Sequence, residues 1–369
     1  MNWIKVLLIN ILLFFSLIGM LLLSPPILNS LYKLVKPEKP KIMDTRSTLE
    51  IYKNFKWANK HFNEFYDLTT TYYDFIGWRR NDYSGETINI NNGIRTTIKS
   101  FETSKETVKY FFFGGSTTWG VGVNDVNTYP SIFSKLTRSD VTNFGETAYI
   151  ARQSLAYLNN YIIDNSLSNM SNTNVVFYDG VNDVAHRCRN EIKGLGTVRE
   201  NQIQNTLNVD KRFSFGKTFS QFKEFASKAI QKFIPNIVSN GKSENYYDCA
   251  SNEKRALEVA TSLVDTWEFT SEIVTALGGK FIAVLQPVAY YGSPDISYLN
   301  LTSNNDKALA AQYKAVYPLI IKIASKRNLN FFDLTGIYNG CNNCYIDFCH
   351  VGPQGQQILV SKLISNLNN

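Results

Sequence analysis

Two short segments far apart in the chain carry the side-chain types that nucleophilic catalysis requires. Asp347 and His350 stand three residues apart near the C-terminus, in a chain with only three histidines. At that spacing the carboxylate can hydrogen-bond the imidazole, which orients the ring and stabilises the imidazolium formed on proton transfer. Ser116 follows two glycines and could expose its hydroxyl on a tight turn. Together these residues would support attack of a serine hydroxyl on an acyl carbon, with histidine as the base.

Two further segments offer hydrogen-bond donors for an oxyanion. Gly145 follows a predicted strand, and a glycine lets its backbone N–H approach a ligand closely. Asn182 follows another strand and offers a side-chain amide. Each segment alone also fits an ordinary turn, with Ser116 capping a helix in the first of them. The Asp347–His350 pair favours a shared site, because a surface loop would not explain the other segments.

The elements that would position these residues begin after residue 105, where short apolar strands alternate with segments of helical spacing. The predicted strands are residues 108–113, 141–144, 174–178, 280–285 and 329–332, and the predicted helices are residues 128–136, 148–163, 308–325 and 358–367. Such alternation is typical of a central parallel sheet covered on both faces, a three-layer α/β/α fold. The carboxyl ends of the strands meet at one edge of the sheet, where we expect the site.

The order of these segments along the chain resembles the blocks of the SGNH/GDSL hydrolase family. The resemblance covers about residues 105–366 and implies a flavodoxin-like α/β/α fold and serine ester chemistry. One departure is that Gly115 stands where the GDS form of the motif has an aspartate, although glycine there is similar to a common variant. The departure leaves the nucleophile assignment intact and removes any hydrogen bond from that aspartate.

By position, the resemblance implies a role for each of five residues. Ser116 matches the nucleophile, His350 the base and Asp347 the carboxylate of a catalytic triad. The backbone N–H groups of Ser116 and Gly145 and the side-chain amide of Asn182 match the donors of an oxyanion hole. Acyl transfer by such a triad requires no metal and no cofactor, and we expect neither.

Two residues outside these blocks are predicted to lie near the substrate. Gln286 follows a predicted strand and should face the cleft. His186 lies four residues beyond Asn182 and could reach the same mouth. It lacks a carboxylate at the spacing that Asp347 offers His350, so its expected role is limited to substrate contact.

An uncharged apolar segment, residues 6–23, stands near the N-terminus. A helix of that length spans roughly 27 Å, close to the thickness of the hydrocarbon core of a bilayer. The residues that follow give a poor context for signal-peptide cleavage, so we expect an uncleaved transmembrane anchor. The predicted domains are the anchor over residues 1–30, a stalk and aromatic-rich extension over residues 31–104, and the hydrolase domain over residues 105–369.

The side of the membrane on which the main domain lies is open from charge alone. More lysines follow the apolar segment than precede it, which favours a cytoplasmic domain by the positive-inside rule. Long domains translocate largely regardless of that bias, and the cysteines fit an oxidising compartment. We therefore expect a single-pass membrane protein whose catalytic domain is extracytoplasmic, on the periplasmic side.

The odd number of cysteines leaves at least one thiol unpaired within the chain. Cys341 and Cys344 fit a redox pair, a zinc site or a small disulfide. The disulfide is the most economical of the three, because no thioredoxin-like unit and no second pair of ligands accompanies them. Cys188 and Cys249 could pair with each other, with Cys349 as the leftover thiol, but the pairing is not deducible from the sequence.

A long polar insertion, about residues 187–254, separates the Asn182 block from the next helix. Phenylalanines form small apolar islands within it. Long excursions from a strand end commonly form a lid or a wall of the substrate site. A helical decoration without such a role fits the insertion equally well.

Composition excludes several classes of protein. A content of 44% hydrophobic and 14% aromatic residues excludes a disordered chain. The net charge of +7 comes from basic and acidic residues that are interspersed, which argues against a nucleic-acid partner. The resemblance implies small acyl groups, for example acetyl esters on cell-envelope carbohydrate, as substrate, and the apolar segment implies the lipid bilayer as a partner. Alternatives are an O-acyltransferase with the same triad and a non-catalytic carbohydrate-binding protein.

Overall fold

The computed structural model describes residues 3–7, 9–16, 44–192, 194, 196–207 and 246–368. The chain divides into two compact units, one of Met1–Ile42 with Asn208–Glu244 and one of Met43–Leu207 with Asn245–Asn369. In the first unit, residues 3–7 and 9–16 are helical, and the rest of the predicted anchor lies outside the described residues. Across the described ranges, no helix is both long enough and apolar enough to cross a membrane.

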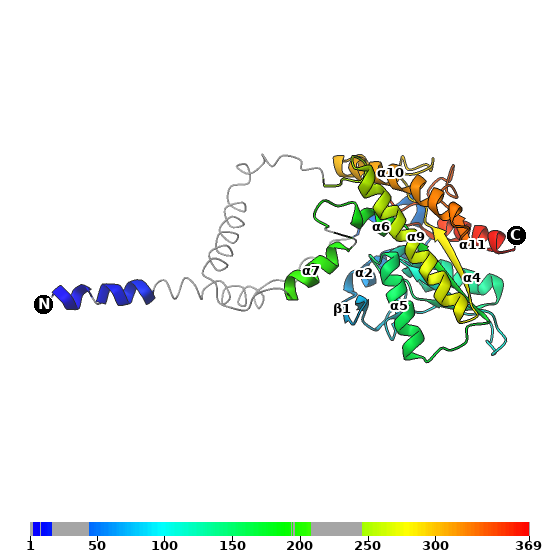
Figure 1. Ribbon diagram of the computed structural model, residues 1–369, viewed down its shortest axis with the longest axis horizontal. Helices are drawn as coiled ribbons and strands as arrows, with labels where there is room; N and C mark the ends of the chain where they lie inside the picture. Colours follow the sequence, from blue (N-terminus) through cyan, green and yellow to red (C-terminus); the bar gives the residue numbers. More distant parts are fainter. Residues whose placement is uncertain are drawn as a thin grey trace. The chain divides into compact units, whose positions relative to one another are not determined.

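The second unit is built on an eight-stranded mixed sheet (Figure 1). Its strands are β3 (Tyr83–Ser84), β4 (Asn89–Asn91), β5 (Ile94–Arg95), β6 (Lys109–Gly114), β7 (Asp140–Asn143), β8 (Thr173–Asp179), β9 (Lys280–Leu285) and β10 (Phe331–Asp333), in the order β10-β9-β8-β6-β7-β5-β4-β3. The strands from β10 to β7 pair in parallel and coincide with the five predicted strands. β5, β4 and β3 continue the sheet in antiparallel pairs.

Helices cover both faces of the sheet, as the alternation of elements predicts. They are α3 (Ser116–Trp119), η3 (Asp125–Asn127), α4 (Tyr129–Thr137), α5 (Ala151–Asp164), α6 (Val181–Arg187), α9 (Glu253–Ala276), α10 (Asn304–Lys326) and α11 (Pro353–Leu367). Side chains alternate between faces along a strand, so Phe111 and Phe113 point to the same face and pack with α5, α9 and α10. On that face α9 lies beside both α5 and α10 (Figure 1). Phe112 packs on the other face with α4 and α11. The result is a three-layer α/β/α arrangement.

Residues 44–104 of the predicted extension belong to the same unit as the α/β fold. They contain η1 (Thr45–Thr48), η2 (Glu50–Tyr52), α2 (Ala58–Asp67) and a separate hairpin of β1 (Thr70–Tyr73) and β2 (Gly77–Arg80). A turn at Asn92 and Gly93 joins β4 to β5, and both residues have the positive φ that a two-residue hairpin turn needs. Because β5 pairs with β7, the extension continues the sheet of the α/β fold.

The cysteines pair as the most economical interpretation predicts. Cys188 is bonded to Cys249 and Cys341 to Cys344, which leaves Cys349 as a buried free thiol. The first disulfide joins the end of α6 to the segment before α9 and so closes the base of the insertion. The insertion includes helix α7 (Val198–Leu207), whereas residues 208–245 lie outside the described residues. Both predictions for the insertion, a lid and a helical decoration, therefore stay predictions.

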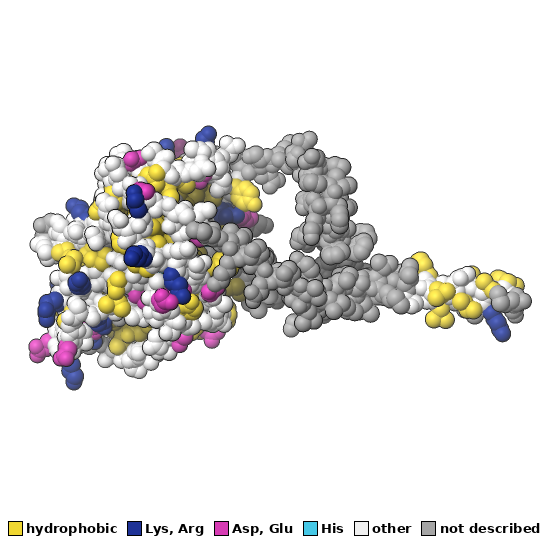
Figure 2. Space-filling view, turned by 180° about the vertical axis from the view of Figure 1, so that it is seen from behind, with side chains coloured by type: hydrophobic (Ala, Val, Ile, Leu, Met, Phe, Trp, Pro, Cys, Tyr) yellow, Lys and Arg dark blue, Asp and Glu magenta, His cyan; other side chains and the backbone are white. Residues whose placement is uncertain are grey.

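The surface shows no concentration of one charge on the face that Figure 2 displays. Lys and Arg side chains lie there among Asp and Glu side chains, with hydrophobic side chains in separate small patches.

Candidate active site

The structure brings Ser116, His350 and Asp347 into one chain of hydrogen bonds. Ser116 is the first residue of α3, directly after β6, and His350 lies in the loop before α11. His350 Nε2 lies 2.6 Å from Ser116 Oγ, and His350 Nδ1 lies 2.7 Å from Asp347 Oδ2. With the ring proton on Nδ1 donated to Asp347, Nε2 is free to accept the serine proton. The arrangement can therefore generate a serine nucleophile.

The Asp347 carboxylate is held in its charged form by the loop around it. Its Oδ1 atom accepts the backbone N–H groups of Cys349 and His350 at 3.0 and 2.8 Å. Burial alone would raise the pKa of Asp347, but His350 and these two N–H groups outweigh burial and bring the pKa well below its ordinary value. An ionised Asp347 is the form that stabilises a protonated imidazole during acyl transfer.

Asn182 lies against the turn that carries Ser116. A Cβ atom on Gly115 would stand 2.4 Å from Asn182 Nδ2, so only glycine lets the amide approach this closely. Asn182 Nδ2 also donates to the backbone oxygen of Tyr149 at 2.8 Å, which fixes the amide beside Ser116. The N–H of Ser116, in the first turn of α3, has no acceptor within the helix.

Gly145 packs closely against α3. A Cβ atom there would stand 2.3 Å from the backbone nitrogen of Trp119, so the glycine is required by close packing on α3. Its N–H donates to Asn143 Oδ1 at 3.0 Å, a contact that the sequence analysis does not include. The Gly145 N–H, which was predicted to serve an oxyanion, is thus already hydrogen-bonded to the side chain of the last residue of β7.

The structure contradicts the prediction that Gln286 faces the cleft. Its side chain is 4% exposed, and its Nε2 donates to Thr117 Oγ1 at 2.7 Å and more weakly to the backbone oxygen of Cys349 at 3.4 Å. The position of Gln286 at the end of β9 was predicted correctly, but its side chain turns into the core and its amide hydrogen-bonds to Thr117 of α3. Gln286 therefore links the nucleophile helix to the histidine loop.

His186 stands one helical turn after Asn182 on α6. Its Nδ1 atom is buried without a hydrogen-bond partner among the described residues. Burial, with the nearby charge of Arg189 as the next cause, lowers the pKa of His186 to about 4, so the ring is neutral at neutral pH. Among the described residues no hydrogen bond joins His186 to Ser116 or His350, and its predicted substrate contact stays a prediction.

One charged residue at the site escaped the sequence analysis. Arg46, from the extension, donates from Nη1 to Asp347 Oδ2 at 3.0 Å. The two residues are 301 positions apart, and nothing in the composition or spacing of the segment around Arg46 distinguishes it from an ordinary polar turn. Only the packing of the extension against the histidine loop reveals the contact.

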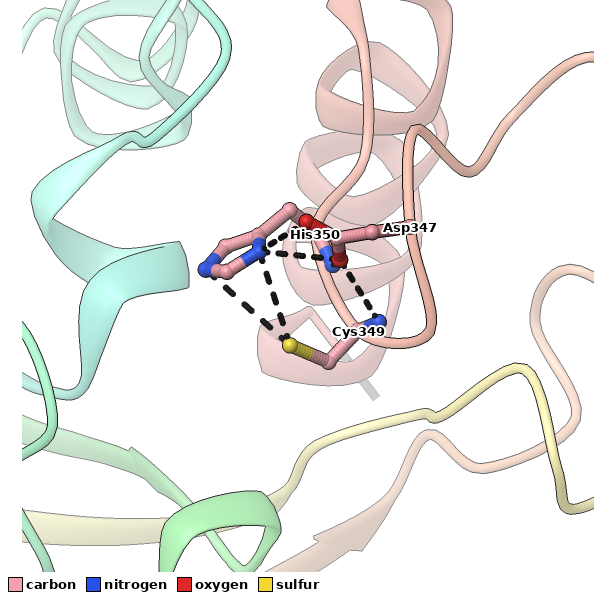
Figure 3. Close-up of side chains that lie close together, drawn as sticks. All are labelled: Asp347, Cys349 and His350. Atoms are coloured by element: carbon pink, nitrogen blue, oxygen red, sulfur yellow. Dashed lines mark hydrogen bonds and ion pairs between the residues drawn. The ribbon is translucent and has the colours of Figure 1, made fainter. Parts of the chain in front are cut away.

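Asp347, Cys349 and His350 form the one cluster in the described ranges that could hold a metal ion (Figure 3). Cys349 Sγ lies 3.6 Å from His350 Nδ1, and Asp347 lies against the same ring nitrogen. That nitrogen and the carboxylate are already joined by a hydrogen bond, and the other ring nitrogen faces Ser116. The Asp347 and His350 donor atoms are thus hydrogen-bonded to each other and to Ser116, and we assign no metal to the cluster.

Comparison with known proteins found no matching family model and no matching curated protein. Among solved structures, the chain is similar to a lipolytic protein of the G-D-S-L family from Veillonella parvula, at 12% identity, covering 70% of this chain and 96% of that one, with a TM-score of 0.37. It is similar to a GDSL-like lipase from Bacteroides thetaiotaomicron, at 14% identity, with 72% and 90% covered and a TM-score of 0.37. It is also similar to a carbohydrate acetylesterase family member from Sinorhizobium meliloti, at 14% identity, with 71% and 99% covered and a TM-score of 0.37.

Proposed function

We propose that this protein is a serine esterase that cleaves small acyl esters, acetyl esters in particular, on cell-envelope carbohydrate. The observation that carries the proposal is the continuous hydrogen-bonded chain from Ser116 through His350 to Asp347. Such a chain is the arrangement by which serine hydrolases on unrelated folds activate a hydroxyl for attack on an acyl carbonyl. The choice of acetylated carbohydrate rests on the family resemblance of the sequence blocks.

The proposed reaction proceeds through an acyl-enzyme. His350 Nε2 takes the proton of Ser116 as Oγ bonds to the acyl carbon, and Asp347 stabilises the resulting imidazolium. The oxyanion accepts hydrogen bonds from the Ser116 N–H and the Asn182 amide, with the Gly145 N–H as a further donor if it leaves Asn143. His350 then protonates the leaving alcohol. Water attacks the acyl-enzyme, with His350 again as the base, and releases the acid.

The proposed location is the outer side of a membrane, with residues 6–23 as a single-pass anchor. The two disulfides support this, because disulfides persist in oxidising compartments and are rare in the cytosol. The uncharged apolar length of the segment supports the anchor. A reporter enzyme that works only outside the cytoplasm should be active when it is fused after the last residue. Activity of a second reporter, one that works only in the cytoplasm, at the same position would contradict the proposed location.

Acetate release tests the proposed function. The full chain is incubated with acetylated envelope polysaccharide and, separately, with p-nitrophenyl acetate, beside the Ser116→Ala variant. We expect release from both substrates by the wild type and from neither by the variant. Activity confined to the small ester would keep the esterase and refute the carbohydrate substrate. Absence of serine-dependent release from both would refute the proposal.

The Asn182→Ala variant tests the oxyanion donor. Because the amide lies beside Ser116 and its bond to an oxyanion forms in the transition state, its loss should lower kcat by about 10²–10³-fold. KM should change little, since the ground-state ester makes weaker use of the donor. Steady-state kinetics on p-nitrophenyl acetate measure both constants. A rise in KM at unchanged kcat would instead assign Asn182 to substrate binding.

A further inference from the structure

The segment of residues 44–52 packs against the loop that follows α3 and against the loop that carries Asp347 and His350. Tyr52 donates its hydroxyl proton to the backbone oxygen of Gly122, in the loop after α3, at 2.6 Å. Tyr52 also packs in one apolar cluster with Ile346, the residue before Asp347. A Cβ atom on Gly352 would stand 2.3 Å from Ile51, so the segment lies directly on the histidine loop. The segment therefore has a defined place at the active site.

Within this segment, one guanidinium is shared between two carboxylates. Arg46 Nη1 donates to Asp347 Oδ2 at 3.0 Å, while Nη2 and Nε donate to Asp44 at 2.7 and 3.0 Å. The guanidinium also lies over the ring of Phe62, 5.0 Å from its centroid. The Arg46 side chain is 25% exposed, so its ion pairs are partly shielded from water. Asp347 Oδ2 thus lies between the imidazole of His350 and the charge of Arg46.

We propose that Arg46 is a positioning residue of the triad, which orients the Asp347 carboxylate and partly neutralises its charge, with Asp44 limiting that neutralisation. The proposal rests on the esterase function proposed above. It makes the extension a working part of the active site, because the arginine that contacts the triad lies outside the segments that resemble the hydrolase blocks.

The orienting effect follows from the number of donors around the carboxylate. Oδ1 accepts two backbone N–H groups, Oδ2 accepts Arg46, and His350 Nδ1 lies 2.7 Å from Oδ2 and 2.9 Å from Oδ1. Removing Arg46 leaves Oδ2 with one donor and allows the carboxylate to turn relative to the ring. Displacements of about 1 Å in a catalytic group cost up to about 10²-fold in rate.

The electrostatic effect has a defined sign. The protonated imidazole is stabilised by negative charge on Asp347, and Arg46 weakens that stabilisation while Asp44 restores part of it. Loss of the arginine charge therefore strengthens the stabilisation that Asp347 gives an imidazolium, and loss of the Asp44 charge weakens it. The titratable and charged groups that face the Asp347–His350 pair are Asp44, Arg46 and Tyr52 from the extension, Cys349 from the loop itself, and Tyr290, which is paired with Asp306.

The pH profile of kcat/KM separates this role from a merely structural one. In Arg46→Gln, kcat/KM should fall by roughly 10–100-fold, and the acidic limb of the profile should move to higher pH by about one unit. In Asp44→Asn the acidic limb should move in the opposite direction. In Arg46→Lys, which keeps the charge and loses the fork, the limb should stay near its wild-type position.

The matched control is Arg327→Gln. Arg327 also contacts two carboxylates, those of Asp265 and Glu268 on α9, but has no contact with the triad in the described part of the chain. Its profile should superimpose on that of the wild type.

The outcomes distinguish this inference from the proposed function. Opposite shifts in Arg46→Gln and Asp44→Asn support the inference, and circular dichroism at each pH shows that the variants are folded. If Arg46→Gln does not fold, the shift in Asp44→Asn, which retains the arginine, decides alone. An active wild type with unshifted limbs in the folded variants would overturn the role of Arg46 and leave the esterase standing. A wild type without serine-dependent activity would overturn the proposed function, and the inference with it.

Discussion

Replacement of Ser116 by alanine should lower kcat for ester hydrolysis by on the order of 10⁶-fold while the protein stays folded. Ser116 Oγ lies 2.6 Å from His350 Nε2, so its hydroxyl is the group that the His350–Asp347 pair is placed to activate. Without it, the base has no nucleophile to deprotonate, and binding and the oxyanion donors alone remain. His350→Ala should give a loss of similar size, because the triad acts as a unit and its single losses are not additive.

Ser84 provides the control for Ser116→Ala, because its loss should leave activity and folding unchanged. Ser84 on the edge strand β3 is exposed, and its nearest hydrogen-bond partner is Asn89 at a long 3.5 Å. Ser84→Ala should therefore match the wild type in kcat, in KM and in its circular dichroism spectrum. Turnover of p-nitrophenyl acetate by a folded Ser116→Ala protein at wild-type rate would exclude Ser116 as the nucleophile.

Replacement of Arg95 by methionine should destabilise the protein by about 3–5 kcal/mol. Arg95 is fully buried and its Nε donates to Asp125 at 2.9 Å. Its other nitrogens donate to the backbone oxygen of Trp119, the last residue of α3, and to those of Gly120 and Val123 in the loop that follows. Methionine keeps the bulk of the side chain but leaves a buried carboxylate and these oxygens without their donor, and such groups are costly when unpaired.

Thermal unfolding measures this effect. The midpoint of Arg95→Met should fall by on the order of 10 °C, and residual activity at low temperature should fall with it, because the loop after the nucleophile helix loses its support. Lys53→Met is the control, since Lys53 pairs with Glu50 at the surface and should leave the midpoint unchanged. Equal midpoints for Arg95→Met and the wild type would show that the loop does not depend on the arginine.

The parallel part of the fold could be predicted because its signals are local. Each central strand is a short apolar run between turn residues, and each lies within a few residues of its predicted position. The parallel pairing also places the ends of β6, β7 and β8 at one edge, which is why Ser116, Gly145 and Asn182 could be associated without coordinates. The spacing of Asp347 and His350 adds a fourth local signal.

The contributions of the extension could not be predicted, because they depend on contacts between residues far apart in the sequence. Arg46 reaches Asp347 across most of the chain, and Arg95 supports the loop after α3 from a strand of two residues. Neither has a pattern of spacing that marks it. Gln286 shows the opposite failure, because its position was correct but its side chain turns into the core, where Thr117 accepts its hydrogen bond.

The lengths of the outer strands have a consequence for the behaviour of the protein in concentrated solution. A sheet ends in two edges whose unpaired backbone groups can recruit a strand from another molecule. Here the outer strands are β10, with three residues, and β3, with two, so each edge offers few groups for such pairing. Brevity at both edges protects this eight-stranded sheet from edge-to-edge aggregation.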